Sequence, residues 1–158
     1  MTNIPKITPF LWFDNQAEEV ANFYVSIFQN SKILNIVRNP AGAMGPEGEV
    51  MVVAFELDGT KFTALNGGPL FKFSEAISFV INCEDQAEVD YFWDKLSAGG
   101  VESRCGWLRD KFGLSWQVIP SALRTLLSNP DRAKAARVNQ AMMQMTKIDI
   151  ASLEKAAE

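Results

Sequence analysis

The sequence predicts an α+β protein with two βαβββ modules, at about residues 1–70 and 71–120, and a helical C-terminal extension over residues 121–158. Two observations support this prediction. The order of one strand, one helix and about three strands occurs twice along the chain. The two helices also begin with the same three residues, which indicates an internal duplication with a period near 70 residues.

The first module begins with an aromatic-rich run over Ile7–Phe13, which predicts a strand. Asp14-Asn15 follows and is typical of a helix N-cap. Apolar residues then recur at helical spacing, so we expect a helix over residues 16–28. Ser31–Arg38 predicts a second strand, and the three glycines and two prolines of Asn39–Gly48 predict a loop.

A β-hairpin closes the first module. Val50–Leu57 and Lys61–Asn66 predict two strands that are joined at Asp58-Gly59. Asp-Gly between apolar runs favours a type I′ turn, whose two central residues need positive φ. Gly67-Gly68-Pro69 then ends the sheet segment.

The second module follows the same order. Ala76–Cys83 predicts a strand, and Glu84-Asp85 caps a helix that we expect to run to about Ala98. Three short strands complete the module, and they are predicted at Val101–Arg104, Gly106–Leu108 and Leu114–Ile119, with a turn at Asp110–Gly113 before the last.

The two helices support a duplication. Gln16-Ala17-Glu18 in the first helix matches Gln86-Ala87-Glu88 in the second. After one residue of slippage, four apolar positions also match, namely Val20, Phe23, Tyr24 and Ile27 with Val89, Phe92, Trp93 and Leu96. The alternative is that two amphipathic helices agree by chance.

The extension over residues 121–158 is predicted to be helical. Ser121 is a candidate N-cap, and Asn129-Pro130 ends one helix and begins another because proline is tolerated at the first helical position. Asp149 is expected to cap a short final helix. An apolar stripe at helical spacing indicates packing rather than ligand binding; its members are Ala135, Val138, Met142 and Met145.

Composition excludes several classes of function. The net charge is −4, and the chain has no basic run that could follow a phosphate backbone, so we expect no nucleic-acid partner. No apolar run approaches the roughly 20 residues of a membrane span. The N-terminus lacks the pattern of a signal peptide, and two cysteines are too few for a disulfide framework, so a cytoplasmic location is expected.

The chain contains no histidine. This removes the commonest metal ligand and the usual general base near neutral pH, and it excludes Ser-His-Asp and Cys-His nucleophile pairs. Cys83 lies beside Glu84 and Asp85, which disfavour a thiolate. Cys105 lies between two arginines, but a structural role is the favoured interpretation for both cysteines.

Alternation along the strands places apolar and polar residues on opposite faces. One face of the strand before Cys83 and of the last strand is wholly apolar and includes Phe79 and Trp116. The other face mixes apolar groups with Ser78 and Gln117. This mixture suits a cupped sheet that lines a partly wet pocket, although an open sheet that faces bulk water would also account for it.

Three segments carry a resemblance to a known family, namely residues 11–19, 64–69 and 105–117. They resemble the PhnB-like group, which is labelled 3-demethylubiquinone-9 3-methyltransferase domain, of the vicinal-oxygen-chelate (glyoxalase/bleomycin resistance/dioxygenase) superfamily. The likeness extends to residues 147–150 of the extension. It implies two βαβββ modules that form a cupped mixed sheet around a cavity, usually in a homodimer.

The resemblance also implies where metal ligands would lie. Metal-using relatives place His or Glu on the first, fourth, fifth and eighth strands, and the matching positions here are Thr8, Asn66, Ser78 and Gln117. Transition metals prefer imidazole, thiolate or carboxylate ligands, and two hydroxyls with two amides do not neutralise a divalent cation. We therefore expect no tightly bound metal and no other cofactor.

The same four positions define the predicted substrate-binding site, and the predicted apolar lining is Phe10, Trp12, Phe62 and Trp107. Trp12 shares a face with Thr8 and Phe10, which makes it a candidate wall for a planar ligand. Trp116, in contrast, is expected to face the helices and to belong to the core.

Three interpretations of function remain. The favoured one is a homodimeric protein that binds a small molecule without chemistry, as bleomycin-resistance relatives do. The second is an enzyme on a small metabolite, by methyl transfer, lyase or dioxygenase chemistry. Methyl transfer is disfavoured because Phe13-Asp14-Asn15-Gln16 is not the glycine-rich loop of a typical S-adenosylmethionine site. The third is an inactive descendant whose dimer surface is its function.

Overall fold

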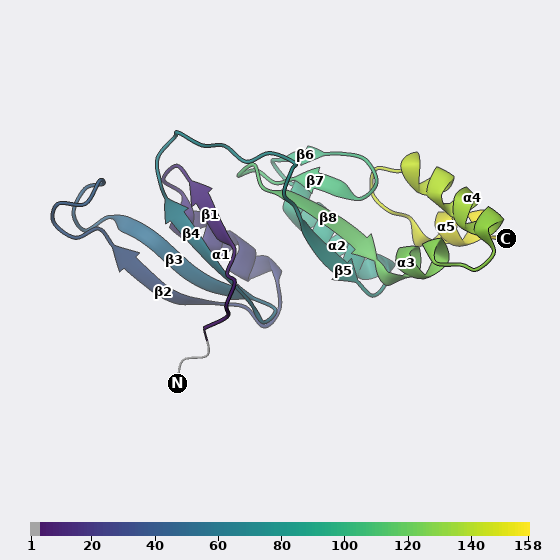
Figure 1. The fold of residues 1–158 in the computed structure, drawn as a ribbon, viewed down its shortest axis with the longest axis horizontal. Coiled ribbons are helices and arrows are strands. Elements are labelled where there is room, and N and C mark those ends of the chain that lie inside the picture. The colour runs from purple at the N-terminus through teal and green to yellow at the C-terminus, as the bar shows by residue number, and fades with distance from the viewer. Residues whose placement is uncertain (1–3) are drawn as a thin grey trace. The chain divides into compact units, whose positions relative to one another are not determined.

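The computed structural model describes residues 4–158, and the chain divides into two compact units, one up to Lys72 and one from Phe73 to Glu158 (Figure 1). We call them the first and the second module; the second includes the extension from Ser121 onward. Each module has one four-stranded mixed sheet, and its elements follow the order βαβββ. The predicted fold class is therefore confirmed.

The first module consists of β1 (Phe10–Phe13), α1 (Ala17–Ile27), β2 (Lys32–Arg38), β3 (Val50–Leu57) and β4 (Thr60–Asn66). Its strand order is β1-β4-β3-β2, with β1 parallel to β4 and the other pairs antiparallel. The predicted hairpin turn is present, since Asp58 and Gly59 have φ of 45° and 84°. The first strand begins at Phe10 rather than Ile7, so Thr8 lies before it.

Helix α1 covers one face of this sheet. Alternate strand residues point toward it and are buried, as the two-residue period of a strand requires; they include Leu11, Phe13, Val53, Phe55, Leu57, Phe62 and Ala64. Tyr24 on the helix is fully buried against Phe55, with ring centroids 6.2 Å apart. Burying each such aromatic side chain contributes roughly 1.5–3 kcal/mol, so this layer holds the module together.

The start of α1 differs from the prediction. The N-cap residue is Gln16, whose side chain makes no capping hydrogen bond, so the expected Asp14-Asn15 cap is wrong. Instead the Oδ1 atom of Asn66, at the end of β4, accepts from the Ala17 amide at 2.8 Å. The Nδ2 group of Asn66 donates to the Val50 carbonyl at 3.0 Å. A residue 49 positions away in sequence therefore caps this helix.

The second module consists of β5 (Phe79–Cys83), α2 (Gln86–Ser97), β6 (Val101–Glu102), β7 (Trp107–Arg109) and β8 (Ser115–Pro120). Its strand order, β5-β8-β7-β6, repeats that of the first module, and β5 is parallel to β8. Asp85 is the N-cap of α2 and accepts from the Glu88 amide at 2.9 Å, as predicted. Ile81, Trp116 and Val118 are buried on the face toward α2.

The extension forms three helices, α3 (Ser121–Leu127), α4 (Arg132–Met143) and α5 (Ile150–Ala156). Ser121 is already helical, because the N-cap of α3 is Pro120. Asp131 caps α4, so Pro130 is not its first helical residue. These two predictions were wrong, whereas Asp149 caps α5 as expected. Four side chains form the buried core of the extension, namely Leu123, Val138, Ile148 and Leu153.

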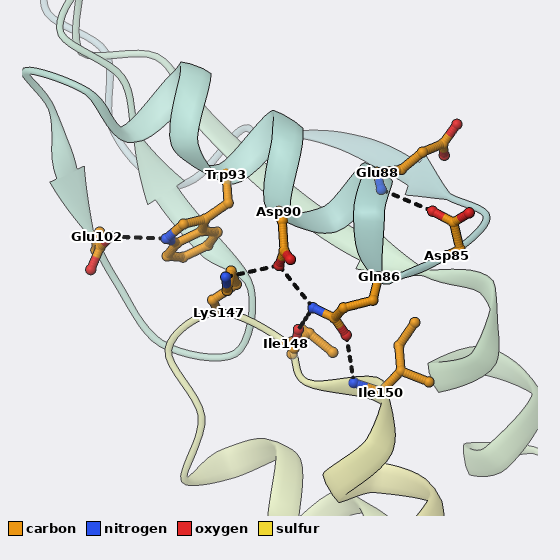
Figure 2. Close-up of polar contacts among 9 residues, drawn as sticks. All are labelled: Asp85, Gln86, Glu88, Asp90, Trp93, Glu102, Lys147, Ile148 and Ile150. Atoms are coloured by element: carbon orange, nitrogen blue, oxygen red, sulfur yellow. Dashed lines mark hydrogen bonds and ion pairs between the residues drawn. The ribbon is translucent and has the colours of Figure 1, made fainter.

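Hydrogen bonds attach the extension to helix α2 (Figure 2). The Gln86 side chain donates to the Ile148 carbonyl at 3.0 Å and accepts from the Ile150 amide at 2.8 Å. Lys147 forms an ion pair with Asp90 at 2.8 Å. The hydrogen bonds from Lys147 and Gln86 lower the pKa of Asp90, and the bond to Asp90 raises the pKa of Lys147.

A second attachment involves the turn before β7. The amides of Cys105 and Gly106 donate to the carbonyls of Met145 and Thr146 at 2.9 and 2.8 Å. Gly106 has φ of 81°, and a Cβ atom there would lie 2.8 Å from the Val118 carbonyl oxygen and 3.1 Å from Ile148 Cγ1. Only glycine fits this close approach. Within residues 4–158, no helix is long and apolar enough to cross a membrane.

Candidate functional site

The face of the second sheet opposite α2 carries the most distinctive set of polar side chains. In β8, Trp116 and Val118 point toward α2, so Ser115 and Gln117 point to the other face. In β7, Leu108 is buried on the α2 side, and its neighbours Trp107 and Arg109 are half-buried and exposed. We call this opposite face of β5, β8 and β7 the uncovered face of the second module.

Two predicted site residues meet directly on this face. The Nε2 group of Gln117 donates to Ser78 Oγ at 2.9 Å, and the two residues lie 39 positions apart in sequence. The strand register places Gln117 between Val80 on β5 and Trp107 on β7. The bond leaves the Gln117 carbonyl oxygen, its second N–H and the Ser78 hydroxyl hydrogen for further bonding.

Ser115 and Arg109 form the next cross-strand pair on this face after Gln117 and Trp107. The register places them opposite each other on β8 and β7. Ser115 is 1% exposed, and within residues 4–158 its hydroxyl has no hydrogen-bond partner. The side chain of Arg109 is 49% exposed and lies 3.9 Å from a carboxylate oxygen of Glu75. Neither residue was among the predicted site residues, although strand alternation puts Ser115 on the face of Gln117 and the charge of Arg109 suits an anionic ligand.

In the first module, Thr8, Phe10 and Trp12 precede or form β1, and Phe10 and Trp12 lie on the face opposite α1. Trp12 donates through Nε1 to the Gly68 carbonyl at 2.9 Å and meets Phe71 edge-on at 4.9 Å between ring centroids. Trp12 therefore packs against the segment that follows β4.

Two predicted lining residues have other roles in the structure. Phe62 is buried on the α1 side, where it stacks on Phe55 with ring centroids 5.4 Å apart. Asn66 uses both ends of its amide to cap α1 and to bind the β3 backbone. Phe10 in β1 corresponds to Val80 in β5. Phe10 pairs with Thr63, and Val80 pairs with Gln117. The first-module residue that corresponds to Gln117 is therefore Thr63 and not Asn66.

The first module also contains a cavity of about 590 Å³, a size typical of small-molecule sites. It lies between the start of α1 and the β2–β3 loop. Most of its lining is polar or charged and includes Asp14, Glu18, Glu19, Arg38, Glu49 and Asn66. Four carboxylates and one guanidinium give this lining a negative charge.

The residues at the expected ligand positions do not fit a metal ion. Ser78 and Gln117 bind each other, and the amide of Asn66 is used by the backbone. Between residues 4 and 158, no three His, Cys, Asp or Glu side chains are grouped to hold a metal. Burial raises the pKa of the Cys83 thiol to about 12, with Glu88 and Asp85 adding to the rise. A neutral thiol at pH 7 is a poor nucleophile.

Two solved structures of low sequence identity share the fold of this chain. Protein PA1353 from Pseudomonas aeruginosa is 17% identical, with a TM-score of 0.61 over 74% of this chain and 98% of that chain. The fosfomycin resistance protein FosX from Listeria monocytogenes is 12% identical, with a TM-score of 0.51 over 75% and 93%. At these identities the two matches show the fold alone.

The family is shown by closer matches. Residues 5–119 match the family model described as 3-demethylubiquinone-9 3-methyltransferase. The PhnB protein from Bacillus cereus is 36% identical, with a TM-score of 0.68 over 74% of this chain and 100% of that chain. No curated protein is significantly similar. The chain belongs to the 3-demethylubiquinone-9 3-methyltransferase family, as the resemblance predicted, and its extension lies beyond the matched residues.

The chain does not fit the methyl donor that the family's description implies. The loop after β1 is Asp14-Asn15-Gln16, without the glycine that lets a backbone approach a nucleoside closely. The sheet order β1-β4-β3-β2 also lacks alternating parallel strands and helices. We therefore derive no methyl-transfer step.

Proposed function

We propose that this protein binds a small molecule on the uncovered face of the second module, without a tightly held metal, and that it does so as a homodimer. The observation that supports this most is the 2.9 Å hydrogen bond between Gln117 and Ser78. It joins β8 to the residue just before β5, which begins at Phe79 rather than at the predicted Ala76, on a face where α2 does not pack. An amide held in place by a neighbouring hydroxyl is a preorganised hydrogen-bonding group, which is how ligand pockets fix orientation.

The neighbours of this pair suit a ligand with an apolar body. Trp107 and Val80 flank Gln117 on the adjacent strands, and Val80 is 42% exposed. A flat molecule could pack against the indole while its polar edge bonds to the Gln117 amide. The pKa shifts at Cys83, Asp90 and Lys147 lie away from this face, so they do not support acid–base catalysis there.

Native mass spectrometry of the protein purified from its own host tests the proposal, because it reports subunit number, metal and co-purifying molecules together. We expect a dimer that carries an organic molecule of low mass and no stoichiometric metal. Gln117→Ala should lose the bound molecule, whereas the surface control Gln140→Ala should keep it. Wild-type protein that carries no molecule even after incubation with cell extract, or a Gln117→Ala variant that binds as well as wild type, would contradict the proposal.

A further inference from the structure

In each module, one face of the sheet lies opposite the helix. The charges on these two faces differ at one cross-strand pair of residues. In the first module, the register sets Glu56 directly opposite Lys61, so a negative side chain faces a positive one across the strands. In the second module, the equivalent pair is Arg109 opposite Ser115. The guanidinium of Arg109 therefore lacks a carboxylate directly across the sheet.

Glu75 is the carboxylate that lies near Arg109, but the two pair only weakly. Its carboxylate oxygen lies 3.9 Å from Arg109 Nη1, beyond hydrogen-bond distance, and the two side chains are 68% and 49% exposed. An exposed ion pair of this length stabilises the protein very little. A ligand carboxylate could displace Glu75 and form the bidentate, hydrogen-bonded pair that arginine prefers.

Ser115 adds an independent observation. Its buried hydroxyl is without a hydrogen-bond partner in the part of the chain that the structure describes, and a buried hydroxyl normally has one. Strand alternation puts Ser115 on the same face as Gln117, opposite Arg109. Because this hydroxyl is buried, an anionic oxygen held by Arg109 could accept its hydrogen only after the side chains that cover it move aside.

We infer that the ligand of the second module is a planar aromatic carboxylate, with its carboxylate on Arg109 and Ser115 and its ring against Trp107 beside Gln117. This inference rests on the proposed function. Trp107 and Arg109 are alternate residues of one strand, so their side chains are roughly 7 Å apart, a distance that one substituted ring can bridge. Glu75 then occupies the carboxylate position while the ligand is absent.

The experiment uses 2-naphthoate and its neutral analogue 2-naphthamide as probes of the full-length chain, followed by ligand-observed NMR titration. The wild type should bind the carboxylate at least about tenfold more tightly than the amide. Arg109→Gln should abolish this preference, and Ser115→Ala should reduce it. Glu75→Gln should increase carboxylate affinity because the competing carboxylate is removed, and Arg104→Gln, on the neighbouring turn, should change nothing.

The outcomes separate this inference from the proposed function. Equal binding of both probes by the wild type, or a preference that survives Arg109→Gln, overturns the inference. Failure of both probes also overturns it, while a co-purifying molecule that depends on Gln117 would leave the proposed function standing. If Ser115→Ala fails to fold, Arg109→Gln and Glu75→Gln still decide the question, because both residues are exposed.

Discussion

The two modules are alike on the side that faces their helix and different on the other side. Leu11 and Phe13 of β1 correspond to Ile81 and Cys83 of β5, and all four are buried. On the opposite faces, Thr63, Lys61 and Glu56 of the first sheet stand where the second sheet has Gln117, Ser115 and Arg109. Both faces are polar at these positions, but the first pairs Glu56 with Lys61, whereas the second pairs Arg109 with the uncharged Ser115.

This difference indicates which part of a duplicated fold can change. Residues under the helix are fixed by packing, since core substitutions alter both volume and stability. Residues on the uncovered face are free to diverge toward binding. The change from a charge pair to an arginine opposite a serine directs the search for function to the second module. The substitutions below, ordered from the largest expected effect to the smallest, test the contrast between the modules.

Each module has an aspartate in a hairpin turn, and replacing it by asparagine should destabilise the second module far more than the first. Asp110 is buried and accepts from the Phe112 and Leu114 amides and from Trp116 Nε1. Asp110→Asn turns one acceptor into a donor that faces donors, so the free energy of unfolding should fall by about 2–4 kcal/mol. Asp58→Asn, in the exposed turn of the first module, should lower it by less than about 0.5 kcal/mol. Chemical denaturation measures both, and equal losses would contradict the expected contrast.

Replacing a turn glycine by alanine should also destabilise the two modules by different amounts. Gly106→Ala introduces both a positive-φ penalty and a clash with the Val118 carbonyl, so we expect a loss of about 2–4 kcal/mol in unfolding free energy. Gly59→Ala has the same positive φ but no atom within 4 Å, and should lose only about 1–2 kcal/mol. Thermal and urea denaturation compare the two variants, and a Gly59→Ala loss as large as that of Gly106→Ala would show that the close approach contributes nothing.

The matching glutamines at the two helix starts provide a third test. Gln86→Ala removes two backbone hydrogen bonds to the extension, so stability should fall by about 1–3 kcal/mol. The effect should be confined to residues 148–156, whose amide hydrogen exchange should accelerate. Gln16→Ala is the matched control, because its side chain caps nothing and the loss should stay below about 0.5 kcal/mol. Unchanged exchange at the Ile150 amide in Gln86→Ala would refute the assigned role.

The Lys147–Asp90 pair should have the smallest effect, since both side chains are substantially exposed. Asp90→Asn should cost at most about 1 kcal/mol. Because the folded-state pKa of Asp90 is lowered, the contribution of the pair is full above the usual carboxyl pKa and disappears as the pH falls through the lower folded value. Because the pKa of Lys147 is raised, the contribution is lost at high pH only as the pH rises through that raised value. The amide hydrogen exchange rates of the extension, corrected for the intrinsic dependence of exchange on pH, should therefore stay constant between about pH 5 and pH 9.

The sequence predicted the modules because their signals are local. Helical spacing, the Asp58-Gly59 turn and the Asp85 cap each depend on neighbouring residues, and the structure contains all three. The cap of α1 was missed because Asn66 acts across 49 positions, a relation that no local pattern records. Ser121 was misassigned for a simpler reason, since a Pro-Ser pair fits a helix start at either residue.

The candidate site was predicted in part. Ser78 and Gln117 were selected from the family pattern, and they are hydrogen-bonded to each other. Phe62 was included although alternation puts it in the core, and Ser115 was left out although alternation puts it on the same face as Gln117. Which residues of neighbouring strands lie opposite each other depends on the strand register, and register follows from the pairing of strands that are distant in sequence.

The attachment of residues 145–150 to α2 and to the turn at Gly106 has a consequence for synthesis on the ribosome. The first module contains all of its own strands by Asn66 and can fold while the rest of the chain is still being made. The second module gains its last contacts only after residues 145–150 have been made, because their backbone groups bond to α2 and to the turn at Gly106. A nascent chain that has not yet reached residue 145 therefore has a complete first sheet, while α2 and the Gly106 turn of its second half still lack these hydrogen bonds.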